Sequence, residues 1–395
     1  LGTRYNPPLP LSEWRVRDQL IEIRSIDLRF SLEESRTFLQ RVIDAPLDED
    51  TIATVHAKTE GWIAGLRLAA LSYSNIETFR GQLDGLSGSN VFVSDYLFSQ
   101  VLTTLTAETQ LFLFQTSILE SVSASLGQAV AAPNHSLGEV QALLQELVAE
   151  NVFTIPLDQT GQWFRYHHLF QDILLTKLAE NASPEVVASL HRRASAWLAE
   201  HDYIEEAIRH SISADDIDTA VELVAANRHE LINQESYQRL SRWLKMFPRQ
   251  VIEGSPDLLL IQARFAQTVR FDIAELYQLT ETIDALLKRL HLEPQRAQLL
   301  SAENEALRAV AFFYIDPDPQ VSLNCCRNAL DILPENWFTM RSYCWMFGAV
   351  ALQMMGDLNG AYAWVGQGRR EDQNAPGGPF ARNVSAEGFV SWVAG

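Results

Sequence analysis

The segment 152–175 constrains the fold more than any other part of the chain. Residues 152–157 and 162–166 are apolar and β-prone, and residues 158–161 between them have the composition of a turn. This pattern predicts a β-hairpin. The chain then changes at once to helical spacing, with one apolar face formed by Leu169, Phe170, Ile173 and Leu174.

Three predicted helices precede this hairpin, at about 107–119, 123–132 and 136–150. The third carries a clear apolar stripe, as an amphipathic helix on a core does. Three helices followed by a two-stranded wing are typical of a winged-helix domain. We therefore expect such a domain at residues 101–180.

The charge of this predicted domain argues against DNA binding. Residues 101–180 contain 2 basic and 8 acidic side chains, a net charge of −6. The helix that would enter the DNA groove carries Glu139, Glu146 and Glu150 and neither Lys nor Arg. Binding to a phosphate backbone needs the opposite sign, so we expect the wing to pack within the protein.

Two histidines, His167 and His168, lie where the hairpin passes into the helix. A helix start presents free N–H groups and the positive end of the helix dipole, so it suits a phosphate, and a histidine there adds a donor. The alternative is a junction histidine bonded to nearby backbone. A metal site is not expected, because the sequence offers no third ligand nearby. We expect His168 to be structural or exposed.

The segment 31–100 is predicted to form a small helical domain. Ser31 and Glu34 have the spacing of a capping box, and a helix follows to about Val42. Further helices are expected at 51–59 and from Gly61, where Trp62 belongs to an apolar stripe.

Helix follows helix from about Pro184 onward, with a weak internal repeat. The form Asp-apolar-x-x-Ala recurs at 216–220 and 357–361, and with one extra residue at 202–207. The segment 329–334 ends in Leu-Pro, as the second helix of a tetratricopeptide hairpin does. The predicted fold is mainly α: a helical domain and a winged helix, followed by a tetratricopeptide-like helical superhelix over 181–395.

Composition indicates the cellular location of the chain. Its 395 residues carry a net charge of −19, and it has no apolar run of the roughly 18 residues that a spanning helix needs. Three cysteines, two of them adjacent, form neither a disulfide framework nor a zinc pattern. We expect a cytoplasmic protein with no membrane segment. The sequence opens without Met or a signal peptide, which suggests a piece of something longer.

Four stretches, in order along the chain, resemble the MalT-like transcriptional activators, which are signal-transduction ATPases with numerous domains. They are TR-x-x-PPLPL with RDQLIEI in 3–23, TEGWIAGLRLAAL at 59–71, WFRYHHLF at 163–170, and LHRRAS with EAIRH in 190–210. The resemblance implies that residues 1–30 are the end of a nucleotide-binding core. It also implies a LuxR-type helix-turn-helix beyond the helical-repeat sensor, which would be truncated at residue 395.

The resemblance assigns nucleotide-binding roles to four residues. Arg4 matches the sensor arginine near the terminal phosphate. Gly61 and Trp62 lie in the segment that covers the adenine, in which Ile63 stands where many relatives have proline. His167 matches the histidine that reaches the β-phosphate of ADP and holds the resting state. The Walker A pattern G-x-x-x-x-G-K-[ST] is absent from the sequence.

The function implied is therefore the central part of an ATP-switched, inducer-responsive transcriptional regulator. ATP and ADP are the implied cofactors of the complete protein, which would be a slow, switch-type ATPase. This chain alone is expected neither to bind ATP tightly nor to hydrolyse it, and no catalytic residue is assigned. The expected partners are an inducer on the helical repeats, further copies of the complete protein, and DNA through the C-terminal domain only.

Two other classes of function stay open. One is a protein-interaction scaffold of a signalling ATPase whose effector does not bind DNA. The other is an enzyme that uses His167, His191 or His210, which ranks last because no nucleophile or paired acid stands at a telling distance.

Overall fold

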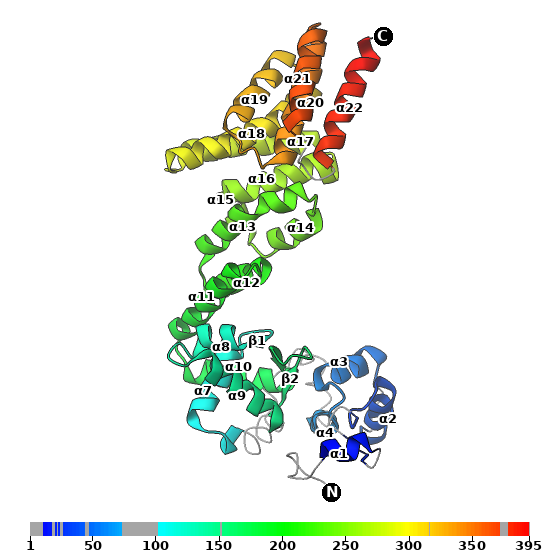
Figure 1. The fold of residues 1–395 in the computed structure, drawn as a ribbon, viewed down its shortest axis with the longest axis vertical. Coiled ribbons are helices and arrows are strands. Elements are labelled where there is room, and N and C mark those ends of the chain that lie inside the picture. Colours follow the sequence, from blue (N-terminus) through cyan, green and yellow to red (C-terminus); the bar gives the residue numbers. More distant parts are fainter. Residues whose placement is uncertain are drawn as a thin grey trace. The chain divides into compact units, whose positions relative to one another are not determined.

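The structure is a computed structural model that describes residues 11–17, 20, 21, 23, 27–43, 47–72, 102–150, 152–315, 317–371 and 378–394. Arg4 lies outside these residues. The chain divides into two compact units, Leu1–Asp202 with Ser213–Asp215, and Tyr203–Ile212 with Asp216–Gly395. The fold is mainly α, as predicted (Figure 1).

The first unit begins with the helical domain. Ser31 caps its second described helix through the predicted capping box, in which Glu34 N–H donates to the Ser31 hydroxyl and the Glu34 carboxylate accepts from Ser31 N–H. Leu39, Ile52, Val55 and Leu66 form the apolar core. The helices are α1 (Leu11–Val16), α2 (Leu32–Val42), α3 (Glu49–Thr59) and α4 (Ile63–Ser72).

The winged-helix domain follows in the same unit, and its three helices and wing occur as predicted. The hairpin strands β2 and β3 pair in antiparallel register, Thr154 opposite Tyr166 and Ile155 opposite Arg165. Its elements are η2 (Leu102–Thr104), α7 (Ala107–Thr116), β1 (Val122–Ser123), α8 (Ala124–Ala131), α9 (Leu137–Ala149), β2 (Thr154–Pro156), β3 (Trp163–Tyr166) and α10 (His168–Asn181). Helix α11 (Pro184–Glu200) packs against α8 and α10.

A third strand, β1, was not predicted from the sequence. It adds to the hairpin in the order β1-β3-β2, with Val122 opposite Phe164. Two residues are too few to show an alternating pattern. The turn of the hairpin is fixed by Asp158, whose carboxylate accepts hydrogen bonds from the Thr160 hydroxyl and from Gln162 and Trp163 N–H. These bonds lower the pKa of Asp158 to about 2.

The second unit is a series of helices in which each packs on the next, from α16 to α22, and α18 and α20 also pack on each other, as do α20 and α22. This arrangement confirms the predicted superhelix of α-hairpins. The elements are α12 (Ile204–Ser213), α13 (Ile217–Asn233), α14 (Tyr237–Lys245), α15 (Arg249–Gly254), α16 (Pro256–Phe265), the π-helix η3 (Ala266–Arg270), α17 (Ile273–Arg289), α18 (Pro294–Tyr314), α19 (Pro319–Ile332), α20 (Phe338–Met354), α21 (Leu358–Glu371) and α22 (Gly378–Ala394).

The repeated Asp and Ala residues have distinct structural roles. Asp216 caps α13 by accepting from Thr219 N–H, and Asp357 accepts from Gly360 N–H at the start of α21. Ala220 and Ala361, four residues further on, are completely buried. The repeat therefore marks helix starts at which a small residue permits close packing. Among the described residues, no helix is long and apolar enough to cross a membrane.

Candidate functional site

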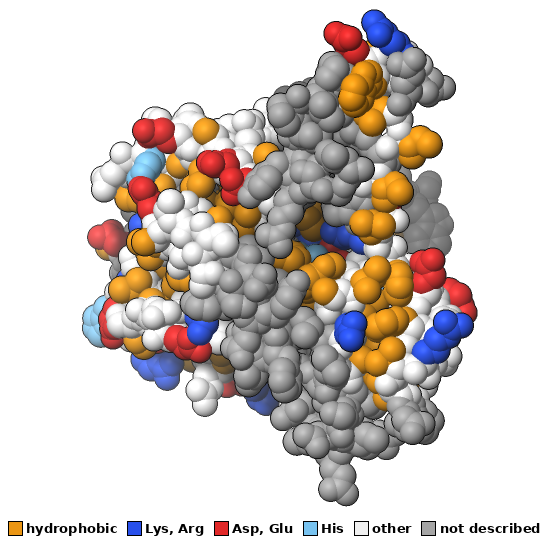
Figure 2. Space-filling model, turned by 90° about the horizontal axis from the view of Figure 1, so that it is seen from below, with side chains coloured by type: hydrophobic (Ala, Val, Ile, Leu, Met, Phe, Trp, Pro, Cys, Tyr) orange, Lys and Arg blue, Asp and Glu red, His pale blue; other side chains and the backbone are white. Residues whose placement is uncertain are grey.

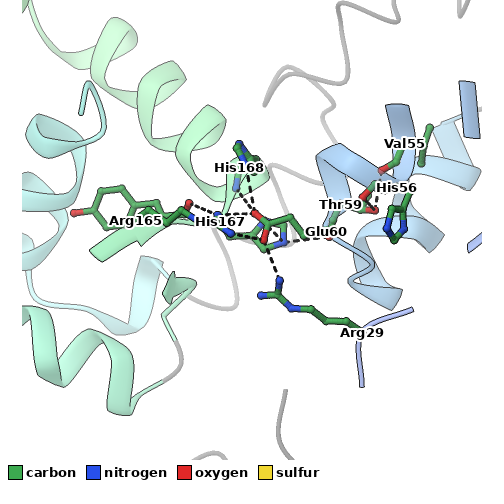
Figure 3. A network of polar contacts seen from close by, with 9 residues as sticks. Arg29, Val55, His56, Thr59, Glu60, Arg165, His167 and His168 are labelled. Atoms are coloured by element: carbon green, nitrogen blue, oxygen red, sulfur yellow. Dashed lines mark hydrogen bonds and ion pairs between the residues drawn. The ribbon is translucent and has the colours of Figure 1, made fainter. Parts of the chain in front are cut away.

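The carboxylate of Glu60 lies at the junction of the helical domain and the winged helix (Figure 3). Glu60 ends α3 in the left-handed conformation with φ 49°. Its Oε1 and Oε2 accept from Arg165 Nη1 and Nη2 at 2.8 and 2.9 Å, a bidentate pair that joins the end of α3 to strand β3. Arg29 adds a third bond from its Nη1 at 3.0 Å.

Helix α10 also donates to this carboxylate. The backbone N–H of His168, at the first residue of α10, donates to Glu60 Oε1 at 3.3 Å, and the exposed His168 ring lies 3.7 Å from it. Burial disfavours the charged form of Glu60, but the hydrogen bonds from Arg165 and His168 outweigh it and lower its pKa to about 2. Glu60 is therefore a carboxylate at neutral pH and acts as the anion at a helix start.

His167 lies beside this cluster and is 3% exposed. Its backbone N–H donates to Phe153 O at 2.8 Å, and its Nε2 lies 3.1 Å from Thr59 O. Since a carbonyl only accepts, Nε2 carries the proton. Nδ1 is buried and has no hydrogen-bond partner. Burial lowers the pKa of His167 to about 4, so the ring is neutral at pH 7.

Aromatic packing closes the same junction from the helical domain. The rings of Trp62 and Phe153 are 5.1 Å apart edge to face, and Trp62 and His167 are 6.2 Å apart. Phe153 in turn packs on Phe170 of α10 at 5.5 Å. Trp62 lies just before α4 and is half-buried, so it is not a core residue of the helix as the predicted stripe implied; its ring packs instead against Phe153 and His167 of the winged helix.

Gly61 is required at its position for two reasons. Its φ is +70°, and a Cβ there would lie 2.2 Å from the backbone oxygen of Phe30. Phe30 N–H donates to Gly61 O at 2.8 Å. Gly61 therefore attaches the chain before α2 to the turn that presents Glu60.

The structure brings three of the four predicted site residues together: Gly61, Trp62 and His167. Their nucleotide-binding roles stay predictions, as does that of Arg4. Arg29, Glu60 and Arg165 are site residues that were not predicted from the sequence. Glu60 and Arg165 have opposite charge and lie within two of the family-like stretches, and this was the available signal for pairing them.

One face of α9, the third helix of the winged helix, packs inside the domain and cannot contact DNA. Val140, Leu144 and Leu147 are buried, and Gln141 Nε2 donates to Gly161 O in the wing at 2.8 Å. Its charged residues are all acidic. These contacts agree with a wing that packs within its own domain.

The class that this fold defines is a helical domain packed on a winged helix and followed along the chain by helical repeats. Residues 98–186 match the family model of the MalT winged helix domain. The resemblance predicted from the sequence is thereby confirmed: the chain contains a MalT winged helix domain.

Relatives cover much of the chain. It is 32% identical over 308 residues, 78% of its length, to the serine/threonine-protein kinases PknK of Mycobacterium tuberculosis and Mycobacterium bovis, and spans 27% of those proteins. A solved signal transduction ATPase with numerous domains and a tetratricopeptide repeat sensor, from Pyrococcus horikoshii, aligns with a TM-score of 0.45 at 13% identity. That alignment covers 93% of this chain and 54% of the other.

Proposed function

We propose that this chain is the central part of an ATP-switched, inducer-responsive transcriptional regulator. Its junction between helical domain and winged helix would respond to the nucleotide, and its helical repeats would bind the signal. The observation that carries the proposal is the convergence of Arg29, Arg165, His167 and the start of α10 on residues 59–60.

The junction has the chemistry of a site that can exchange one anion for another. Two guanidinium groups and a backbone N–H meet on the Glu60 carboxylate, and His167 lies beside them. These are the donor types that bind phosphate in proteins. In this structure the Glu60 carboxylate accepts the hydrogen bonds of these donors, and Thr59 O accepts the hydrogen bond from His167 Nε2–H. Contact of His167 with a phosphate of ADP therefore requires its Nε2–H to leave Thr59 O, or its Nδ1 to gain a proton.

The nucleotide itself would be held mainly by a core that precedes this segment. Four aliphatic side chains in the first 30 residues are largely exposed: Val16 at 89%, Ile21 at 92%, Ile23 at 70% and Leu28 at 58%. Hydrophobic groups are also visible among charged side chains on the face of the molecule shown in Figure 2. Four exposed aliphatic side chains within one short segment are the support for a covering domain here.

In this proposal the protein has two states with different ligand preferences. ADP would favour a closed state through His167. An inducer on the helical repeats would favour an open, ATP-bound state that self-associates and binds DNA through a C-terminal helix-turn-helix. Each ligand shifts the balance only by its difference in affinity for the two states.

The test uses the complete protein that contains this chain. His167→Ala should speed the release of ADP and raise activity without inducer. His168→Ala is the matched control, because His168 is the adjacent residue but its side chain is 61% exposed. Unchanged ADP release in His167→Ala, or equal effects in both variants, would contradict the proposal.

A second candidate is a scaffold that links a signalling ATPase to an effector other than a DNA-binding domain. The observation that favours it is that the relatives are serine/threonine-protein kinases by name. The coding sequence on both sides of this segment discriminates the two: a helix-turn-helix after residue 395 supports the regulator, and another effector supports the scaffold.

A further inference from the structure

The second unit buries several charged side chains, and most of them are balanced. Arg228, 2% exposed, donates to Glu303 Oε2 at 2.8 Å and to Asp257 at 3.2 Å. Arg296 donates to the other Asp257 oxygen at 3.0 Å. Two guanidinium groups thus meet two carboxylates, which is the condition for burying charge at a tolerable cost.

Arg264 of α16 is the exception. Its side chain is 1% exposed, and within the described part of the chain no carboxylate lies within ion-pair distance of it. Its Nη1 donates to Gln267 Oε1 at 2.6 Å, but its Nε and Nη2 are buried and have no hydrogen-bond partner. A buried cation without a counter-charge is far more costly than an unpaired neutral group.

The two unused donors form one edge of the guanidinium group. The edge made by Nε and Nη2 matches two oxygens of a carboxylate or phosphate. Gln267, 4% exposed, extends this edge: its Oε1 accepts from Arg264, so its Nε2–H2 group points elsewhere, and that nitrogen is also buried without a partner. Three buried donors without a hydrogen-bond partner therefore lie on one turn of backbone, at the entry to the π-helix η3.

The surroundings are aromatic and positively charged. The Arg264 guanidinium lies 4.9 Å from the Tyr343 ring centroid, and Arg382 lies 4.8 Å from the same centroid. Arg382 donates to Glu235 at 2.7 Å, so that carboxylate is already paired. π-helical turns inside helices occur often at functional sites. The environment of Arg264 thus favours an anion and supplies none from the described residues.

We propose that the helical-repeat unit binds an oxyanion of a small ligand, a carboxylate or a phosphate, on the Nε–Nη2 edge of Arg264 with Gln267 as the second donor. The ligand would bridge α16 and η3 and lie close to α20. That this ligand is the inducing signal rests on the proposed function, whereas the binding itself does not.

The experiment measures binding of inorganic phosphate and of succinate to this chain by calorimetry and thermal denaturation at constant ionic strength. At least one probe should bind and stabilise the wild type. Arg264→Met should weaken that binding by at least about tenfold. Arg264→Lys keeps the charge but loses the two-donor edge, and should also weaken it.

Arg270→Gln is the matched control, because Arg270 ends the same π-helix but is exposed and pairs with Glu275. It should bind like the wild type. Binding of only one probe supports the site and assigns the ligand class. If Arg264→Met does not fold, Arg264→Lys decides. No binding of either probe, or binding within twofold of wild type in every folded Arg264 variant, overturns the site. That failure leaves the His167 test untouched, so the two proposals fail separately.

Discussion

Glu60 and Arg165 are 105 residues apart in the chain, yet their side chains form a bidentate ion pair at 2.8 and 2.9 Å. The Glu60 side chain is 10% exposed and that of Arg165 is 27% exposed. Partial shielding from water makes such a pair stronger than one on the open surface. The pair is therefore a direct energetic connection between the helical domain and the wing.

A double-mutant cycle with Glu60→Gln and Arg165→Met measures that connection. We expect a coupling free energy of about 1–2 kcal/mol in urea unfolding at low salt. The control pair is Arg249 and Glu253, which lie 2.6 Å apart but are 89% and 54% exposed. That pair should couple by only about 0.5 kcal/mol or less. Equal coupling in both pairs would show that the Glu60 contact is an ordinary surface ion pair.

Gly61 and Gly161 have similar backbone conformations but differ in the space available for an added side chain. Both have positive φ, +70° and +63°, but a Cβ at Gly161 meets nothing within 4 Å. Gly161→Ala should cost about 1 kcal/mol of unfolding free energy for the backbone conformation alone. Gly61→Ala should cost at least about 2 kcal/mol more, because it also collides with Phe30 O. Thermal denaturation of the two variants checks this, and similar melting temperatures would refute it.

Acid should weaken the junction through His167. Its folded-state pKa of about 4 is below the ordinary value of 6.5, so the unfolded chain binds the proton more readily. The free energy of unfolding therefore decreases as the pH falls from 6.5 toward 4. At pH 5 the decrease from this one group is about 2 kcal/mol. Glu60, with a pKa of about 2 against 4.5, adds its loss only below about pH 4.5.

The measurement compares wild type with His167→Gln, which keeps a donor for Thr59 O but does not titrate. The difference in unfolding free energy between the two proteins should change by about 2 kcal/mol between pH 7 and pH 5. Because His229 in the second unit is buried with a pKa also lowered to about 4, only this difference isolates His167. A difference that does not vary with pH would contradict the burial argument.

The chain by itself is predicted not to bind ATP tightly, since its sequence lacks the Walker A glycines and lysine that hold the phosphates. Isothermal calorimetry with ATP and Mg²⁺ should show no binding in the micromolar range. The complete protein is the positive control. A micromolar dissociation constant for this chain would mean that the junction holds nucleotide unaided.

Sequence patterns predicted the elements of the first unit well where the signal was local. The capping box at Ser31, the turn at Asp158 and the apolar stripe of α9 each depend on residues a few positions apart. The Glu60–Arg165 pair depends on how two domains pack, and no local pattern encodes it. Arg264 was missed for a similar reason, because an arginine in sequence gives no sign that it will be buried without a carboxylate.

In the proposed function, the contacts at Glu60 change with the bound nucleotide. The backbone N–H of His168 donates to Glu60 Oε1, so its hydrogen exchange measures that change directly. Hydrogen–deuterium exchange of residues 163–170 should be measured in the complete protein with ADP and with ATP plus inducer. The account predicts protection at His168 in the ADP state and exchange at least about tenfold faster in the ATP state. Equal exchange in the two states would contradict it.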